Sequence, residues 1–236
     1  DELSLLLPNL TIQRMDLDTT RNKGKLESII ESVENGETDV LVGTQMVTKG
    51  FDFVKMITVG IFDIDRMIHL PDFRAAERCF QVVMQVAGRA GRRQEQGKLL
   101  IQTNNPNQPI IQQIVASNYV DFYNEELKER ERFHYPPFTR IIEISVRHED
   151  LMVAKDAATS FGKTLRLNLG ADKVLGPEAP SVGRIRNKFH FHILLKLEPS
   201  AINFTKVKLL IKETAKQLIT EKTHKKLQIV LNVDPL

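Results

Sequence analysis

The chain has 236 residues, of which 42% are hydrophobic, and a formal net charge of +3. It is long enough for two small domains, each with its own core. No apolar run approaches the ~20 residues that a membrane-spanning helix needs, so we expect a soluble protein with no membrane partner. The single cysteine, Cys79, excludes an internal disulfide and a multi-cysteine metal site, and it is typical of a cytoplasmic protein.

The start of the chain has neither a secretory signal nor an initiator methionine, so we expect it to begin inside a longer protein. Residues 1–138 alternate short apolar runs with helical patterns, which predicts an α/β domain with a parallel sheet of the RecA-like type. Strands are expected at 11–15, 39–43, 56–62 and 99–103, helices at 25–33 and 73–87, and a helical stem at 109–132.

Pro136 and Pro137 cannot continue a helix, so we place the domain boundary between residues 138 and 139. After it the expected order changes to β-α-β-β-α-β. Strands are expected at 141–146, 173–175, 189–197 and 227–233, and helices at 151–167 and 204–220. This order predicts a smaller α+β domain of the ferredoxin-like type over residues 139–236, a fold that does not by itself specify a function.

The two halves differ in charge. Residues 1–138 contain 16 Lys and Arg against 20 Asp and Glu, a net charge of −4, whereas residues 139–236 contain 17 against 10, a net charge of +7. The second half therefore has either an anionic partner or a basic solvated surface, and charge alone does not decide between them.

The most specific pattern is the run Gln85-Val86-Ala87-Gly88-Arg89-Ala90-Gly91-Arg92, which lies between a predicted helix and a predicted strand. Arginines three positions apart face one side of a helical turn. Their permanent charge suits a phosphoryl-transfer site, and the two glycines let the backbone approach a nucleotide. The alternative is a basic helix end closed by glycine.

This run resembles motif VI of superfamily-2 helicases, in which the second motor lobe supplies arginine fingers to ATP that the first lobe holds. The resemblance implies that Arg89 and Arg92 are catalytic fingers. It implies that Gln85 lies by the phosphates or couples the lobes, and that Gly88 approaches the nucleotide.

Residues 43–53 resemble motif V of the same helicases. The resemblance implies that Thr44 and Gln45 bind the DNA backbone, that Gly50 and Asp52 bind the nucleotide, and that Lys49 serves either ligand. A position after a buried strand suits this role, because free amides and hydroxyls there can hold a phosphate. The alternative is a strand-to-helix turn capped by polar residues.

Asp63 and Asp65 follow a predicted strand and could suggest a metal site. We favour hydrogen bonds to amides or pairing with arginine, because no third ligand is evident. For Asp18, which precedes two threonines, we favour a helix cap over a DNA contact.

Four further segments narrow the resemblance to PriA-type replication-restart helicases. Together with the two motifs, they extend the resemblance over nearly the whole sequence. They are residues 14–20, 63–66, 71–78 and 232–236. The resemblance implies an ATP-dependent DNA helicase or translocase that restarts stalled forks and helps to load the primosome. It implies a monomer whose partners are DNA, single-strand-binding protein and primosome proteins.

The ATP-binding loop, the acidic box that holds magnesium and the zinc-binding cysteines of these helicases do not occur in the chain. The resemblance implies that ATP with Mg²⁺ is held mainly by a first lobe and that zinc is bound outside this chain, so we expect the chain alone to be inactive. Alternatives are a non-catalytic nucleic-acid- or protein-binding module with a degenerate motor lobe, and another superfamily-2 repair helicase.

In the second half, cations alternate with aromatic residues over 184–192. Arg184, Arg186 and Lys188 could bind the phosphates of single-stranded DNA, with Lys206 and Lys208 as further candidates, or they could be solvated charges. Strand alternation favours phenylalanines 189 and 191 in the core and histidines 190 and 192 facing water. Two histidines without a third ligand do not predict a metal site.

Overall fold

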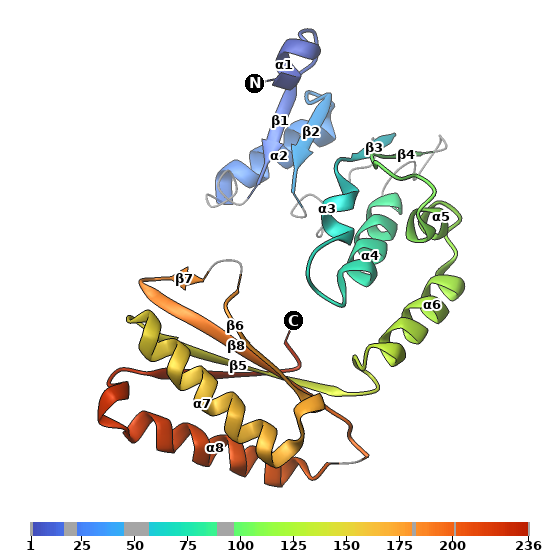
Figure 1. The fold of residues 1–236 in the computed structure, drawn as a ribbon. Coiled ribbons are helices and arrows are strands. Elements are labelled where there is room, and N and C mark those ends of the chain that lie inside the picture. Colours follow the sequence, from blue (N-terminus) through green and yellow to red (C-terminus); the bar gives the residue numbers. More distant parts are fainter. Residues whose placement is uncertain are drawn as a thin grey trace. The chain divides into compact units, whose positions relative to one another are not determined.

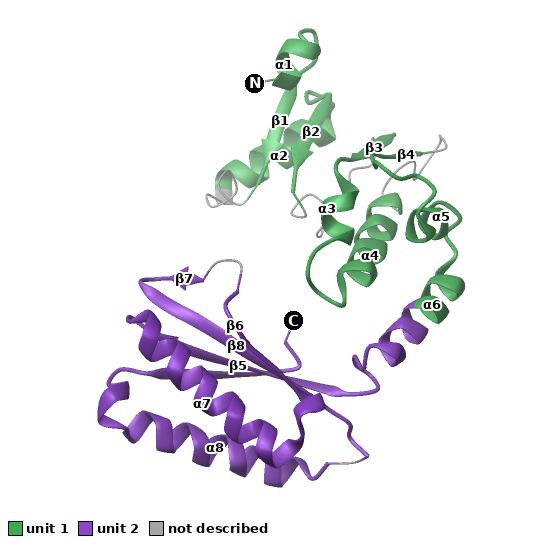
Figure 2. Ribbon diagram, viewed as in Figure 1, with its two compact units in different colours: residues 1–125 green, residues 126–236 purple. Residues whose placement is uncertain are grey.

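The computed structural model describes residues 2–16, 23–44, 57–88, 97–180, 183–200 and 202–235. The chain forms two compact units, Asp1–Glu125 and Glu126–Leu236 (Figure 2). No helix in the described ranges has both the length and the apolar composition that crossing a membrane requires.

Unit 1 is built from parallel βα units, as the alternating pattern predicts. Strands β1 (Ile12–Met15) and β2 (Val40–Gly43) pair in parallel, and α2 (Lys23–Asn35) lies between them along the chain. Strands β3 (Thr58–Ile61) and β4 (Lys98–Ile101) form a second parallel pair, and the chain between them contains α3 (Ile64–Ile68) and α4 (Ala75–Ala87). Helix α1 (Glu2–Leu6) precedes the first strand, and α5 (Pro109–Val115) and α6 (Tyr119–Arg132) follow the last (Figure 1).

Helix α4 forms because its apolar residues recur every three or four positions and so line one face. Cys79, Phe80 and Val83 on that face are buried against α3, α5 and α6. The Phe80 ring stacks on the Phe122 ring with their centroids 4.5 Å apart. Burial raises the pKa of the Cys79 thiol to about 11, so this cysteine is a core residue rather than a reactive one.

The helical stem predicted for residues 109–132 is two helices rather than one. Ser117 has a φ of 52°, which is outside the range of a right-handed helix, so α5 and α6 are separated there. The side-chain oxygen of Asn118 then accepts a hydrogen bond from the Asp121 amide, 3.2 Å away, at the start of α6.

Unit 2 follows the predicted β-α-β-β-α-β order with one additional short strand. Its elements are β5 (Arg140–His148), α7 (Leu151–Leu169), η2 (Ala171–Lys173), β6 (Val174–Glu178), β7 (Arg184–Ile185), β8 (Lys188–Leu197), α8 (Phe204–Thr220), η3 (Lys222–His224) and β9 (Gln228–Val233). The sheet is antiparallel in the order β6-β8-β5-β9, and β7 pairs with β8.

Helices α7 and α8 lie side by side on one face of this sheet (Figure 1). Alternate residues of the central strands, such as Ile144 on β5 and Ile193 on β8, point toward the helices and are fully buried. Phe161 of α7 and Ile211 of α8 cover them. The other face of the sheet, which we call the open face, carries the remaining residues of β5 and β8.

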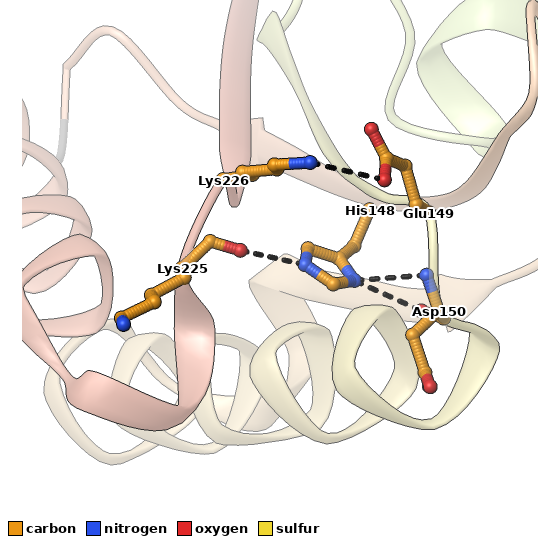
Figure 3. Close-up of polar contacts among 5 residues, drawn as sticks. All are labelled: His148, Glu149, Asp150, Lys225 and Lys226. Carbon is orange, nitrogen blue, oxygen red and sulfur yellow. Dashed lines mark hydrogen bonds and ion pairs between the residues drawn. The ribbon is translucent and has the colours of Figure 1, made fainter.

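His148 joins the end of β5 to the chain that enters β9 (Figure 3). Its Nδ1 atom accepts a hydrogen bond from the Asp150 amide at 2.9 Å, and its Nε2 atom donates to the Lys225 carbonyl at 2.7 Å. Asp150 also caps α7 by accepting from the amides of Met152 and Val153. One side chain therefore fixes the start of α7 and the start of β9.

The boundary between the units lies within α6, whereas the sequence-based boundary lies at residues 138 and 139. The segment before residue 139 is attached to unit 2 through side chains. The Lys196 ammonium donates to the Phe133 carbonyl at 2.7 Å and lies 3.7 Å from the centre of the Tyr135 ring. Thr139 donates to the His134 carbonyl at 2.7 Å. These contacts are not visible in the proline pattern, which marks only where a helix cannot continue.

Candidate functional site

The arginine-rich run begins at the carboxyl end of α4. Gln85 is exposed there, on the side of the helix away from its buried face. Gly88 is the C-cap, and its amide donates to the Met84 carbonyl at 3.1 Å. A Cβ atom added at Gly88 would lie 3.6 Å from the nearest described atom outside its neighbours, so packing within the described chain does not require glycine at this position. Arg89 and Arg92 lie outside the described residues.

The second helicase-like segment begins at the carboxyl end of β2. Thr44 is exposed directly after that strand, where the ends of parallel strands commonly meet ligands. Gln45, Lys49, Gly50 and Asp52 lie outside the described residues, as does Asp18. The paired strand β1 ends at Met15, and Asp16 after it is buried and forms an ion pair with Arg14.

One of the two acids after β3, Asp65, binds the loop that follows β4. The Asp65 carboxylate accepts hydrogen bonds from the Asn104 amide and the Thr103 hydroxyl, both at 2.7 Å. These bonds, the amide first, lower the pKa of Asp65 below its usual value of 3.8. The prediction that these acids accept hydrogen bonds from amides is confirmed at Asp65. No cluster of three metal-ligating side chains occurs among the residues that the structure describes.

The cations of unit 2 lie on a tight hairpin between β7 and β8. Arg184 pairs with Phe189 and Ile185 with Lys188, which leaves Arg186 and Asn187 as a two-residue turn. Both turn residues have positive φ, 49° and 62°, as a turn of type I′ requires. Asparagine adopts this conformation readily, but arginine does so rarely, and no turn was predicted here.

The hairpin brings the three predicted phosphate-binding cations together, but not on one face. Residues directly opposite in an antiparallel pair share a face. Arg184 lies over the Phe189 ring, 5.1 Å from its centre, and donates to the Asn187 side chain. Lys188 lies on the open face opposite Ile185, and Arg186 is at the tip of the turn.

The open face carries a chain of polar contacts from β5 to β8. Glu143 forms an ion pair with His192 at Nδ1, and His192 Nε2 lies 3.5 Å from the Ser145 hydroxyl oxygen. The Arg147 Nε atom donates to the same hydroxyl oxygen at 2.9 Å. The sequence pattern did not identify Glu143, Ser145 or Arg147, because β5 and β8 are far apart along the chain.

The expectation that His190 faces water is wrong. His190 is on the open face, but it is only 6% exposed because it lies directly across from Arg147 and beside the hairpin. Burial, and then the neighbouring Arg147 charge, lower the pKa of His190 below its usual 6.5. The expectation that Phe189 and Phe191 face the core is confirmed.

A pocket of about 150 Å³ lies between α8 and the β5 and β9 strands. Its walls are mainly apolar, with Phe204, Ile211 and Leu231 among them, and Arg140 and Lys208 provide charge. Arg140 also forms an ion pair with Asp234 at 3.4 Å. Lys206 is exposed on the first turn of α8.

Comparison with known proteins assigns a class to each unit. A family model of the helicase conserved C-terminal domain matches residues 2–94, and a family model of the primosomal protein N C-terminal domain matches residues 131–236. The chain is thus a helicase C-terminal lobe followed by a primosomal C-terminal domain.

Relatives of the chain are described as replication restart protein PriA. The protein of Bacillus subtilis is 35% identical over the whole chain, and that of Synechocystis is 36% identical over the whole chain. The protein of Treponema pallidum is 41% identical over 83% of the chain. The chain spans 29%, 27% and 30% of the lengths of these three relatives, respectively. It belongs to the PriA family of replication restart proteins.

Proposed function

We propose that the chain supplies the second motor lobe and the C-terminal domain of an ATP-dependent DNA helicase that restarts stalled replication forks and helps to load the primosome. The similarity to replication restart proteins over the whole chain carries this proposal. ATP with Mg²⁺ is held mainly by a first lobe, zinc is bound outside this chain, and the protein acts as a monomer in the cytoplasm.

The proposed folds are a RecA-like lobe for unit 1 and a ferredoxin-like domain for unit 2. Parallel strand pairs with intervening helices support the first. The sheet order β6-β8-β5-β9, with two helices on one face, supports the second.

Within this function Arg89 and Arg92 act as arginine fingers. Three observations support this role: α4 is anchored in the core up to Val86, Gln85 is exposed, and the described structure does not require glycine at position 88. A guanidinium at such a site stabilises charge that develops on the transferred phosphate. Gln85 and Gly88 lie beside the nucleotide.

The test is ATP turnover in a protein that combines this chain with an ATP-binding first lobe. Arg89→Ala or Arg92→Ala lowers DNA-stimulated turnover by on the order of 10³ and spares most ATP binding, because a finger acts chiefly on the transition state. Arg66→Ala, an exposed arginine of α3, is the control. Turnover equal to the control would reassign both arginines to structure. The 236-residue chain alone hydrolyses no ATP above a buffer blank.

The segment after β2 binds both substrates. Thr44, Gln45 and Lys49 contact the DNA backbone, and Gly50 and Asp52 contact the nucleotide. The exposed position of Thr44 at the carboxyl end of a parallel strand supports this arrangement.

Unit 2 binds single-stranded DNA without sequence preference, through the β7–β8 hairpin. The net charge of residues 139–236 and the ordered turn that presents Arg184, Arg186 and Lys188 support this role. Ordered cations lose less conformational entropy on binding than mobile ones.

Titrating a labelled oligonucleotide at several salt concentrations tests the hairpin. Replacing all three cations by alanine weakens binding and flattens the log-log salt slope by roughly 0.7 per lost phosphate contact. The control is Lys155/Lys163/Lys222→Ala, which removes the same charge from exposed positions elsewhere in unit 2. If the two variants give the same slope and affinity, the hairpin is not part of the DNA site.

A second candidate function of unit 2 is docking of an acidic tail of a partner protein such as single-strand-binding protein. The apolar pocket with Arg140 and Lys208 favours it, because apolar walls with a few cations suit an acidic segment that ends in apolar residues. An acidic group at Arg140 would replace the existing partner, Asp234. An acidic-tail peptide added to the oligonucleotide titration distinguishes shared from separate sites.

A further inference from the structure

The open face of unit 2 gathers positive groups from two strands that are distant in sequence. Arg147 on β5 lies directly across from His190 on β8, and Ser145 lies across from His192. Lys188 is on the same face, two positions before His190. The ring centroids of His190 and His192 are 6.4 Å apart.

The acids near this group are few. Glu143 is paired with His192, and Glu178 of β6 is opposite His192 in register. Strand β9 contributes the uncharged residues Gln228 and Val230 beside Arg147 and Ser145. On the hairpin, Arg184 lies on the other face and Arg186 is at the tip.

The arrangement disfavours a charge on His190. Its ring is buried, and burial first and then the Arg147 charge lower its pKa, with smaller contributions from His192 and Lys188. A hydrogen bond with the Ile185 backbone acts in the opposite direction, but the net pKa remains lowered. Like charges held close together raise the free energy of the folded chain, and an anion bound among them would offset that cost. A phosphate at this position would also favour protonation of His190.

We propose that Arg147 and His190 extend the hairpin's single-strand contact onto the open face, where they form a phosphate site whose occupancy is coupled to proton uptake. The inference rests on the proposed DNA binding by unit 2 and adds residues and a pH dependence to it. Arg147 is suited to the contact because its Nε–H is held by the Ser145 hydroxyl, which leaves the terminal guanidinium nitrogens to bind an anion.

The expected pH dependence follows from the sign of the shift. His190 is neutral in the free chain at neutral pH, and the bound phosphate raises its pKa, so binding takes up a proton and strengthens as the pH falls. Lys188 and Arg147 remain charged over this range and do not contribute to the change.

The experiment titrates the 236-residue chain with an oligothymidylate of about 12 nucleotides. The wild-type chain binds the oligothymidylate at least roughly threefold more tightly at about pH 6 than at about pH 8. The variant Arg147→Gln flattens the salt slope by roughly 0.7, and Arg147→Lys restores it. His190→Gln removes most of the pH dependence. The control is Lys163→Gln. Lys163 is an exposed cation on α7, which covers the other face of the sheet.

Imidazole NMR signals of His190 are followed against pH in the free chain, with the oligothymidylate and with inorganic pyrophosphate. They distinguish failure of this inference from failure of the proposed DNA binding. If the chain binds DNA through the hairpin but Arg147→Gln behaves like Lys163→Gln and the His190 pKa does not rise with either ligand, the inference is overturned and the proposed function stands. If DNA does not bind but pyrophosphate raises the His190 pKa, the phosphate site stands without the DNA function. If neither ligand has an effect, both fail.

Discussion

Asp63 and Asp65 show how the setting of a residue decides its role. Both follow β3, but the Asp63 side chain makes no capping hydrogen bond, whereas Asp65 accepts two bonds from the segment after β4. The Asp63 backbone, with a φ of 51°, lies in the left-handed region that aspartate and asparagine tolerate. Asp65 therefore links two strand ends, and Asp63 provides the bend between β3 and α3.

We expect Asp65→Asn to lower the thermal midpoint of the chain near neutral pH, by roughly a few degrees. The folded-state pKa of Asp65 is lowered, so its stabilising effect is present above the unfolded value near 3.8 and is lost as the pH falls through the lowered value. Circular dichroism melts at about pH 7 and about pH 3 measure this difference. Asp63→Asn is the matched control, and an equal effect of the two variants would contradict the assignment.

At the scale of elements, capping side chains fix where the two long helices of unit 2 begin. Asp150 and Asn203 each accept two amide hydrogen bonds at the starts of α7 and α8. His148 adds a connection between the β5–α7 turn and the Lys225 carbonyl before β9 (Figure 3). Among the described strands, β9 is hydrogen-bonded to β5 alone, so its position depends on such connections.

We expect His148→Ala to reduce the free energy of unfolding of unit 2 by about 1–2 kcal/mol, because it removes two hydrogen bonds to backbone groups. Chemical denaturation with a probe in β9 would measure the loss, and hydrogen exchange of the β9 amides would rise with it. Lys226→Ala is the control, since its ion pair with Glu149, at 3.5 Å, is exposed and contributes less than about 1 kcal/mol. A loss no larger than that of the control would show that His148 is not a connector.

At the scale of the whole molecule, the attachment of residues 133–138 places the unit boundary within α6. Lys196 binds both the Phe133 carbonyl and the Tyr135 ring, and burial lowers the pKa of Lys196. The match of the primosomal C-terminal domain also begins before residue 139, at residue 131. A fragment that starts at residue 139 retains Lys196 but lacks both of its partners.

We expect fragments 126–236 and 139–236 both to unfold cooperatively, with the longer one more stable by about 1–2 kcal/mol, from one hydrogen bond and one cation–π contact. Urea denaturation of the two fragments measures the difference. Lys196→Met in the longer fragment should remove most of it. Equal stability of the two fragments would mean that residues 133–138 add nothing to unit 2.

The sequence by itself determined the class of each unit and the order of its elements, because apolar spacing encodes helices and strands locally. Helix α8 was predicted with its observed bounds, Phe204–Thr220, and both parallel strand pairs follow the predicted βα pattern. The motif residues that would bind ATP and DNA are sequence predictions as well. All of them stay predictions, and six lie outside the described residues: Gln45, Lys49, Gly50, Asp52, Arg89 and Arg92.

Only the tertiary structure decided which side chains meet. Strand alternation predicted an exposed His190, but the hairpin and Arg147 bury it. The cations at 184, 186 and 188 looked like one group, but the two-residue turn divides them between faces. Local periodicity predicts on which face of its own strand a side chain lies. It does not predict which residues pack over that face, because those residues come from strands tens of positions away along the chain. The packing of the core brings them together.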